Sequence, residues 1–295
     1  MASSPARPNR ALTIAKLIGI VAAMGLLAAG VLLPYVGGLG LAANHEASKF
    51  LDQPCNLVET PPPQKTILYA SDSLSTEVAT SAGVYANAKG LNIVYVASYP
   101  AGVNDLSGQL GAAAGAAPDL LLEAGHLSES VRTVQQAQQM NLQPKLLAFS
   151  DGPGPSGFTG ALRKAANYAV GTTQWAPAAR NRTSYFLDTF HYSLAYAARF
   201  GHLPDEHAAA ATAACLTLEV AIERAGSTAA EEVRKALTDM DLNTFFGEIK
   251  FDDRGANVAK PAYVQQIQAG RPVLIWPPDI ATARPRYPDP GWAKR

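Results

Sequence analysis

Apolar and polar residues follow one another in blocks along residues 66–151, in a pattern that predicts three successive strand-then-helix units. Each unit begins with a short apolar run and continues with apolar residues at helical spacing. The predicted strands are Lys65–Ala70, Asn92–Ala97, Asp119–Leu122 and Lys145–Ser150. Strands that are buried on both faces of a sheet have continuous apolar sequences, and strand–helix–strand crossovers make neighbouring strands parallel. The pattern therefore predicts an open α/β sheet.

The last third of the chain predicts helices first and strands afterwards. Asp151–Gly157 has the composition of a loop. Ser184 could cap a helix that ends at Gly201, and a second helix is expected at about Ala208–Ala225. Thr228–Glu231 has the spacing of a capping box that would open a third helix. The apolar face of the first helix would consist of Phe186, Phe190, Leu194 and Ala197. Further strands are predicted at Ala169–Trp175, Gly247–Phe251, Tyr263–Ile267 and Pro272–Trp276.

A long uncharged stretch lies near the N-terminus. Residues 17–44 contain no charged side chain, and Leu17–Leu33 approaches the ~20 apolar residues that span a bilayer. The basic residues that precede it predict a cytoplasmic N-terminus and an extracytoplasmic remainder. Small residues near position 42 would also permit cleavage by signal peptidase. Residues 1–43 are therefore predicted to be a removed signal peptide or a retained membrane anchor, followed by a polar linker over residues 44–65.

The composition narrows the function classes. The chain is 48% hydrophobic and 16% charged, and its 24 Lys and Arg residues equal its 24 Asp and Glu residues, so nothing favours nucleic acid as a partner. Cys55 and Cys215 lack the spacing of a zinc site, and a disulfide between them stays open. His202–His207 does not have the spacing of a zinc protease, and Pro204 would break the helix that such a site needs, so a solvated loop is expected. No metal, cofactor, nucleotide loop or catalytic residue is predicted.

Several segments in one order resemble a known family. In the first half they are Ile67–Asp72, Tyr99–Pro100 and Pro118–Asp119. In the second half they are Ala221–Ser227, Thr244–Gly247 and Gln265–Gly270. Together they resemble type I periplasmic binding proteins, in the leucine/isoleucine/valine-binding branch of ABC importers. The resemblance covers about residues 65–288 and implies a Rossmann-like parallel sheet lobe.

The resemblance also implies how the chain is divided. Residues 66–288 would form the binding-protein domain, of which 66–175 are an intact α/β lobe. Residues 176–288 would supply helices and closing strands that are shared with a truncated lobe, and residues 289–295 would be a tail. The membrane segment and linker stand where the family has the units of its first lobe, so most of that lobe is expected to be missing.

Candidate binding residues follow the predicted strands, because ligands of open α/β sheets bind beyond the carboxyl ends of the strands. The resemblance gives Asp151 the position of the family's acidic residue that binds the ligand ammonium, and a turn cap is the alternative. His126 matches a position that is often aromatic and walls the pocket, or else it caps the helix that begins at Leu127. Asp72 could reach the cleft or cap the helix near Leu74. Ser71 follows the same strand, and Leu74 lies where some relatives have an aromatic ring.

The resemblance therefore implies an extracytoplasmic substrate-binding component of an ABC importer, without catalysis. Its expected ligand is a branched-chain or related amino acid, and its expected protein partner is a membrane permease. Two alternatives use the same fold: a membrane-anchored sensor, and a shortened relic that binds nothing tightly. An enzyme on a flavodoxin-like sheet would need an acid, base or nucleophile in the cleft, and the sequence supplies no recognisable one.

Overall fold

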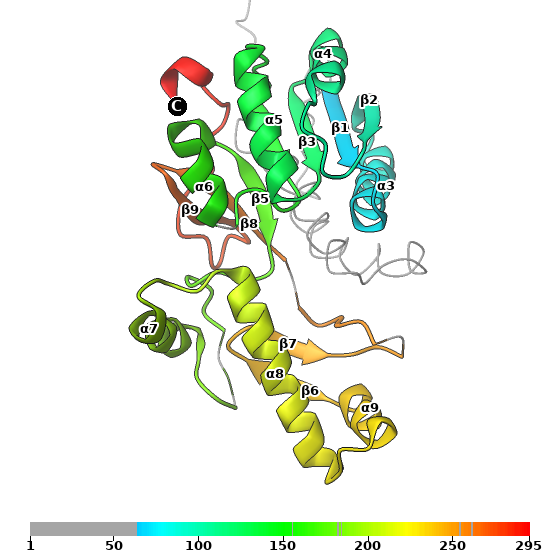
Figure 1. Cartoon of the computed structure of the whole chain (residues 1–295), viewed down its shortest axis with the longest axis vertical. Helices are drawn as coiled ribbons and strands as arrows, with labels where there is room; N and C mark the ends of the chain where they lie inside the picture. The colour runs from blue at the N-terminus through cyan, green and yellow to red at the C-terminus, as the bar shows by residue number, and fades with distance from the viewer. Residues whose placement is uncertain (1–63, 155, 182, 184, 254, 261) are drawn as a thin grey trace, which may run out of the picture.

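A computed structural model describes residues 64–295 except 155, 182, 184, 254 and 261. The predicted signal or anchor, nearly all of the linker and Cys55 lie outside these residues. Within the described part, no helix combines the length and the apolar character needed to cross a membrane. The described chain forms a sheet lobe and a smaller helical lobe, which Figure 1 shows one above the other.

The sheet lobe is built on a seven-stranded sheet with strand order β2-β1-β3-β4-β5-β8-β9. The strands are β1 (Gln64–Ala70), β2 (Asn92–Tyr99), β3 (Leu120–Ala124), β4 (Leu146–Phe149), β5 (Val170–Thr173), β8 (Tyr263–Gln268) and β9 (Arg271–Trp276). The first five strands of this order, β2, β1, β3, β4 and β5, pair in parallel. The last two, β8 and β9, are antiparallel to their neighbours. The predicted α/β sheet is confirmed, and each of its predicted strands is present within a few residues of its expected limits.

Helices cover both faces of this sheet. They are α3 (Ser73–Ala88), α4 (Ser107–Gly115), α5 (Leu127–Gln139) and α6 (Ser156–Leu162), and α6 continues into the 3₁₀ turn η1 (Arg163–Ala166). Adjacent strand residues alternate between two cores: Ile67 packs on the face that α3 covers, and Leu68 packs on the face that α4, α5 and α6 cover. Because successive side chains of a strand point to opposite faces, this alternation explains the continuous apolar runs.

The connections between strands show where the strand order of the sheet reverses. The chain runs from β1 through α3 to β2 on one side, and then through α4 to β3 on the other side of β1. The strand order therefore reverses between β1 and β3. Open α/β sheets bind ligands outside the carboxyl ends of the strands at such a switch point. The segments that leave β1 and β3 there are Ser71–Ser73 and Gly125–His126.

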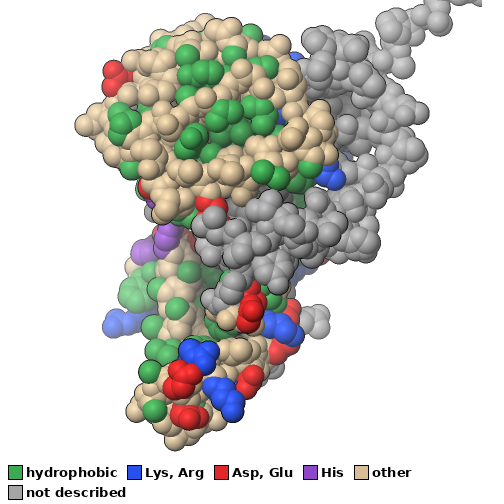
Figure 2. All heavy atoms as spheres, turned by 90° about the vertical axis from the view of Figure 1, so that its right-hand side faces the viewer, with side chains coloured by type: hydrophobic (Ala, Val, Ile, Leu, Met, Phe, Trp, Pro, Cys, Tyr) green, Lys and Arg blue, Asp and Glu red, His purple; other side chains and the backbone are tan. Residues whose placement is uncertain are grey.

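The helical lobe packs around an aromatic core. It contains α7 (Thr189–Phe200), α8 (Glu206–Ala225), α9 (Ala230–Thr238) and the hairpin of β6 (Asp241–Thr244) and β7 (Gly247–Lys250). Tyr192 stacks on Phe245 with ring centroids 3.9 Å apart, and Trp175 Nε1 donates to the Phe245 carbonyl at 3.0 Å. Charged side chains gather at the far end of this lobe, where α9 carries Glu231, Glu232 and Arg234 (Figure 2).

The first helix of this lobe differs from its prediction. It begins at Thr189 with Asp188 as N-cap, although it does end at Gly201, which has the expected positive φ of 78°. Ser184, the predicted cap, lies outside the described residues. The predicted apolar face is not buried, since Phe186, Phe190 and Leu194 are 51–63% exposed. The buried positions are Thr189, Tyr192 and Ser193, because Tyr192 supplies the ring that stacks in the core.

Other local predictions also fail. The capping box at Thr228–Glu231 is wrong, because α9 begins at Ala230 with Ala229 at the N-cap position and no side-chain cap. Ser227 Oγ instead accepts a hydrogen bond from the Ala229 amide. The sequence also missed α6, which starts inside the segment interpreted as a loop, and the short strand β6.

The exposed face of α7 leads to a stability prediction. Replacing Phe190, which is 63% exposed, by serine is expected to change the free energy of unfolding by no more than about 0.5 kcal/mol. The matched control is Phe158→Ser at a fully buried position, which should cost about 3–5 kcal/mol. Urea denaturation measures both values. A loss of more than about 2 kcal/mol for Phe190→Ser would show that another part of the chain or another molecule covers this face.

The C-terminal residues, predicted as a tail, pack against the sheet lobe. The Arg295 guanidinium forms an ion pair with Asp289, donates to the Ala165 carbonyl at 2.6 Å and lies 3.8 Å from the Trp292 ring centroid. Trp292 Nε1 donates to the Leu142 carbonyl at 3.0 Å. These contacts hold the last residues beside α5 and η1.

Candidate functional site

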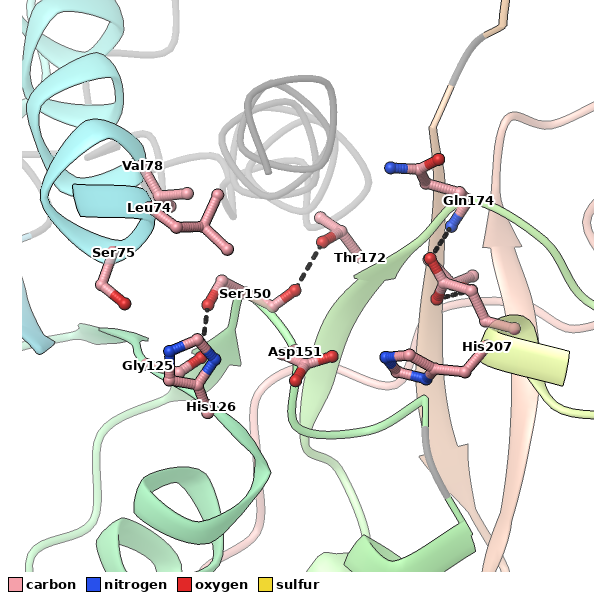
Figure 3. A pocket seen from close by; sticks show the side chains of 12 residues that line it. Leu74, Ser75, Val78, Gly125, His126, Ser150, Asp151, Thr172, Gln174 and His207 are labelled. Atoms are coloured by element: carbon pink, nitrogen blue, oxygen red, sulfur yellow. Dashed lines mark hydrogen bonds between the residues drawn. The ribbon is translucent and has the colours of Figure 1, made fainter. Parts of the chain in front are cut away.

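A cavity of about 260 Å³ opens at the carboxyl ends of the parallel strands, at the switch point (Figure 3). Side chains from α3, from the strand ends and from the start of α8 meet there. Its walls are formed by Leu74, Ser75, Val78, Gly125, His126, Ser150, Asp151, Thr172, Thr173, Gln174, Glu206 and His207. The cavity thus lies between the two lobes, with the helical lobe contributing Glu206 and His207.

Asp151 lies at the centre of this cavity. It follows β4, and Figure 3 shows its carboxylate between the imidazole rings of His126 and His207. Burial raises the pKa of Asp151, and nearby Glu206 acts in the same direction, while the two histidines oppose the rise. The ionised form of such a partly buried carboxylate is stabilised by a cationic partner, because an unpaired charge in a poorly solvated site is costly.

His126 and Asp72 lie close together at the rim. His126 Nε2 is 3.3 Å from Asp72 Oδ2. Asp72 is also the N-cap of α3, and its two oxygens accept hydrogen bonds from the Ser75 amide at 2.9 Å and the Ser75 hydroxyl at 2.8 Å. Burial opposes ionisation of Asp72, but these hydrogen bonds and His126 outweigh it and lower its pKa. Asp72 therefore caps its helix and also contacts the histidine of the cavity.

The remaining sequence-predicted residues divide into two groups. Leu74 lines the cavity and, together with Val78 one turn further along α3, gives it an apolar wall. Ser71 does not line the cavity; its amide donates to the Tyr99 carbonyl at 2.8 Å and continues the pairing of β1 with β2. Three of the five predicted residues, Leu74, His126 and Asp151, thus line the cavity. Asp72 contacts His126 without lining the cavity, and Ser71 lies outside the group.

Glu206 and His207 were missed by the sequence reading, which interpreted His202–His207 as a solvated loop. In the structure α8 begins at Glu206, with Asp205 as its N-cap. Glu206 Oε1 accepts from the Gln174 amide at 2.9 Å, and Oε2 accepts from the Thr173 hydroxyl at 2.6 Å. Glu206 therefore ties the first turn of a helical-lobe helix to the end of β5, where the chain leaves the sheet lobe.

Hydrogen bonds between neighbouring strand ends shape the floor of the cavity. Thr172 Oγ1 donates to the Ser150 carbonyl at 2.8 Å, and Ser150 Oγ donates to the Gly125 carbonyl at 3.0 Å (Figure 3). These bonds link the ends of β5, β4 and β3. They fix the position from which Asp151 projects.

The carboxyl group of Glu123 is fully buried, two residues before Gly125 of the cavity wall. The Tyr99 hydroxyl donates to one oxygen, and the Ser130 hydroxyl donates to the other at 2.6 Å. Burial raises the pKa of Glu123 to about 7, and the two hydrogen bonds limit the rise. Gly125 is required next to this group, because a Cβ there would lie 2.2 Å from the Glu123 carboxylate and 2.4 Å from the Tyr99 hydroxyl. The signal that could have revealed Glu123 in the sequence is an acidic residue at the end of an apolar strand.

The chemistry of the cavity is that of a binding site for a small polar solute. Carboxylates, imidazoles and hydroxyls face an apolar wall, and no Lys or Arg is among its lining residues. Within the described chain, no three His, Cys, Asp or Glu side chains are arranged to hold a metal ion. Cys215 is exposed on α8, and it forms no disulfide within the described residues.

A parallel α/β lobe whose strand-end cavity also receives side chains from a second lobe is typical of two-lobed ligand-binding proteins. Residues 64–272 match the family model described as periplasmic binding protein. The chain belongs to this family, and the relatives that it matches are type I members named for binding leucine, isoleucine and valine.

Individual relatives agree with this assignment. The chain is 25% identical over 232 residues to Leu/Ile/Val-binding protein homolog 7 of Brucella melitensis, covering 75% of this chain and 57% of that protein. It is similar in structure to the leucine-binding protein LivK of Thermotoga maritima, with a TM-score of 0.66, 20% identity, and 73% and 60% of the two chains covered. It is also similar to LivJ of Streptococcus pneumoniae in complex with isoleucine, with a TM-score of 0.60, 20% identity, and 70% and 58% covered. The chain therefore spans about three fifths of the length of these relatives.

Proposed function

We propose that this chain is the extracytoplasmic substrate-binding component of an ABC importer and that it captures an amino acid or a related small solute that carries an ammonium group. The observation that carries this proposal is the position of Asp151, a partly buried carboxylate at the end of β4 that faces the cavity between the lobes. An ammonium in this cavity would meet Asp151, while an apolar part of the solute would pack against Leu74 and Val78. The names of the relatives that bind leucine and isoleucine support this class of ligand.

The proposed action is closure of the two lobes on the solute. Glu206 and His207 enter the cavity from the helical lobe, and Asp151 and His126 enter it from the sheet lobe. A solute that contacts both sets binds the closed arrangement more tightly than the open one, and it shifts the population by this difference in affinity. The closed form would then dock on a membrane permease, without catalysis by the binding protein.

The helical lobe is proposed to be a shortened version of the family's first lobe. The exposed apolar side chains of α7 support this, since the missing part of a complete first lobe could cover them. The boundaries of this proposal are residues 66–175 for the sheet lobe and 176–288 for the segment shared with the shortened lobe. Residues 1–43 are proposed to export the chain, either as a cleaved signal peptide or as a retained anchor, and residues 44–65 to link them to the domain.

A thermal-shift screen tests the function. The full-length chain in mild detergent is mixed with a panel of amino acids, aliphatic amines and carboxylates. An ammonium-bearing solute at 100 times its Kd should add about 2.7 kcal/mol of stability, which raises Tm by roughly 5–10 °C. If no ammonium-bearing solute raises Tm, the proposal fails and the chain is a binding protein by descent only.

A further inference from the structure

A groove on the sheet lobe continues outward from the cavity between α5 and α6. Its volume is about 750 Å³, and it shares His126, Asp151 and His207 with the cavity. On the α5 side it is lined by Leu127, Ser128, Val131, Arg132 and Gln135, and on the α6 side by Gly157 and Ala161. The two α6 residues are small and lie four positions apart, so they share one face of the helix and leave the groove open.

Arg132 is the only cationic Lys or Arg side chain among the residues that line this groove. It is half-buried, and its Nη1 is buried without a hydrogen-bond partner in the described chain. Buried N–H groups of proteins nearly always have a partner, and hydrogen bonds to charged groups are among the strongest. The guanidinium of this groove-lining residue therefore has unused donor capacity at Nη1.

Asp151 and Arg132 occupy different parts of the groove. The Leu127 amide, at the first residue of α5, interacts with the Asp151 carboxylate, whereas Arg132 lies five residues further along the helix. At a rise of 1.5 Å per residue, the backbone positions of Leu127 and Arg132 are about 7.5 Å apart along the axis of α5. Leu127 and Val131, one turn apart on the same face of α5, also line the groove. The groove therefore offers an anion, two apolar side chains and a cation.

We propose that Arg132 binds a carboxylate of the ligand while Asp151 binds its ammonium, so that the ligand is a zwitterion whose two charges are separated by several bonds. In an α-amino acid both groups are attached to one carbon, which is too short to reach both side chains. An ω-amino acid or a dipeptide has the required separation, with methylene or side-chain atoms to lie over Leu127 and Val131. This inference rests on the proposed function and narrows its substrate class.

Isothermal titration calorimetry of the full-length chain tests the inference. The probes are ε-aminocaproate, δ-aminovalerate, glycylglycine, L-leucine and n-pentylamine, which has the ammonium and the chain but no carboxylate. At least one longer zwitterion should bind about 10- to 100-fold more tightly than n-pentylamine and L-leucine, because a charged hydrogen bond is added. A preference for glycylglycine would identify a peptide ligand, and a preference for the other two would identify an ω-amino acid.

The variants Arg132→Gln and Arg132→Lys isolate the side chain. Arg132→Gln should abolish the preference for the zwitterion and leave the affinity for n-pentylamine within about twofold, while Arg132→Lys should keep part of the preference because it keeps the charge. Arg271→Gln, at an exposed position of the same lobe, is the matched control and should change neither value. If zwitterion and amine bind equally, or if Arg132→Gln keeps the preference, the inference is wrong while the proposed function stands. If no ammonium-bearing probe binds, both fail.

Discussion

Replacing Asp151 by asparagine is expected to weaken the binding of an ammonium-bearing solute by about 30-fold or more. The substitution keeps the size of the side chain and removes its charge, so the ammonium loses its anionic partner in a partly buried site. Removing one member of a buried charge pair costs about 2–5 kcal/mol, since the remaining charge stays desolvated. Calorimetric titration of both proteins with the solute that raises Tm most in the screen measures the ratio of the two Kd values.

The pH dependence of binding tests the role of Asp151 in a second way. The ammonium requires an ionised Asp151, and burial raises the pKa of this carboxyl. The affinity of the unmodified chain should therefore fall on acidification, beginning at a higher pH than for an ordinary aspartate, and Asp151→Asn should lack this contribution. Asp279→Asn, at an exposed position of the same lobe, is the matched control. An equal Kd for the unmodified chain and Asp151→Asn would remove Asp151 from the site.

Glu123 is expected to make the fold less stable as the pH rises. Burial moves its pKa from an ordinary value of 4.5 to about 7, so the folded chain holds a proton that the unfolded chain has lost. Its stabilising contribution is complete below pH 4.5 and is lost as the pH rises through 7. The pKa difference corresponds to about 3 kcal/mol of stability. This figure is not reduced by solvent screening, because the group is fully buried.

Urea denaturation between pH 4.5 and 8 measures this effect. Glu123→Gln keeps two polar atoms for the Tyr99 and Ser130 hydroxyls and cannot ionise, so its stability relative to the unmodified chain should rise by about 3 kcal/mol across this range. Glu232→Gln on the exposed surface of α9 is the control and should retain the pH dependence of the unmodified chain. Parallel pH profiles for Glu123→Gln and the unmodified chain would contradict the assignment of a buried, protonated carboxyl.

The parts of the fold that could be predicted are those with a strong local pattern. The strands from β1 to β4 are apolar runs followed by helical spacing, and such runs are produced by burial on both faces. The pattern was less informative for α7. Phe190 and Leu194 mark an amphipathic helix, but an apolar stripe does not say whether anything covers it. The short helix α6 contains Gly157 and Gly160, which weaken the helical signal.

The site was predicted only where it belongs to the strand ends. Asp151 and His126 follow predicted strands, and parallel strands bring their carboxyl ends to one edge. Glu206 and His207 come from another lobe, more than fifty residues further along the chain, and only tertiary structure brings them to this edge. Glu123 could have been noticed locally, but the hydroxyls that hold it come from Tyr99 and Ser130, which no spacing in the sequence connects to it.

Hydrogen–deuterium exchange with and without the solute selected by the thermal screen tests most directly that the cavity between the lobes is the binding site. Binding is predicted to slow amide exchange together at residues 72–75, 125–127, 150–152 and 206–209, which come from both lobes. Slower exchange that is confined to other segments, such as the exposed helix α7, or that includes the sheet lobe but omits the first turn of α8, would contradict the account.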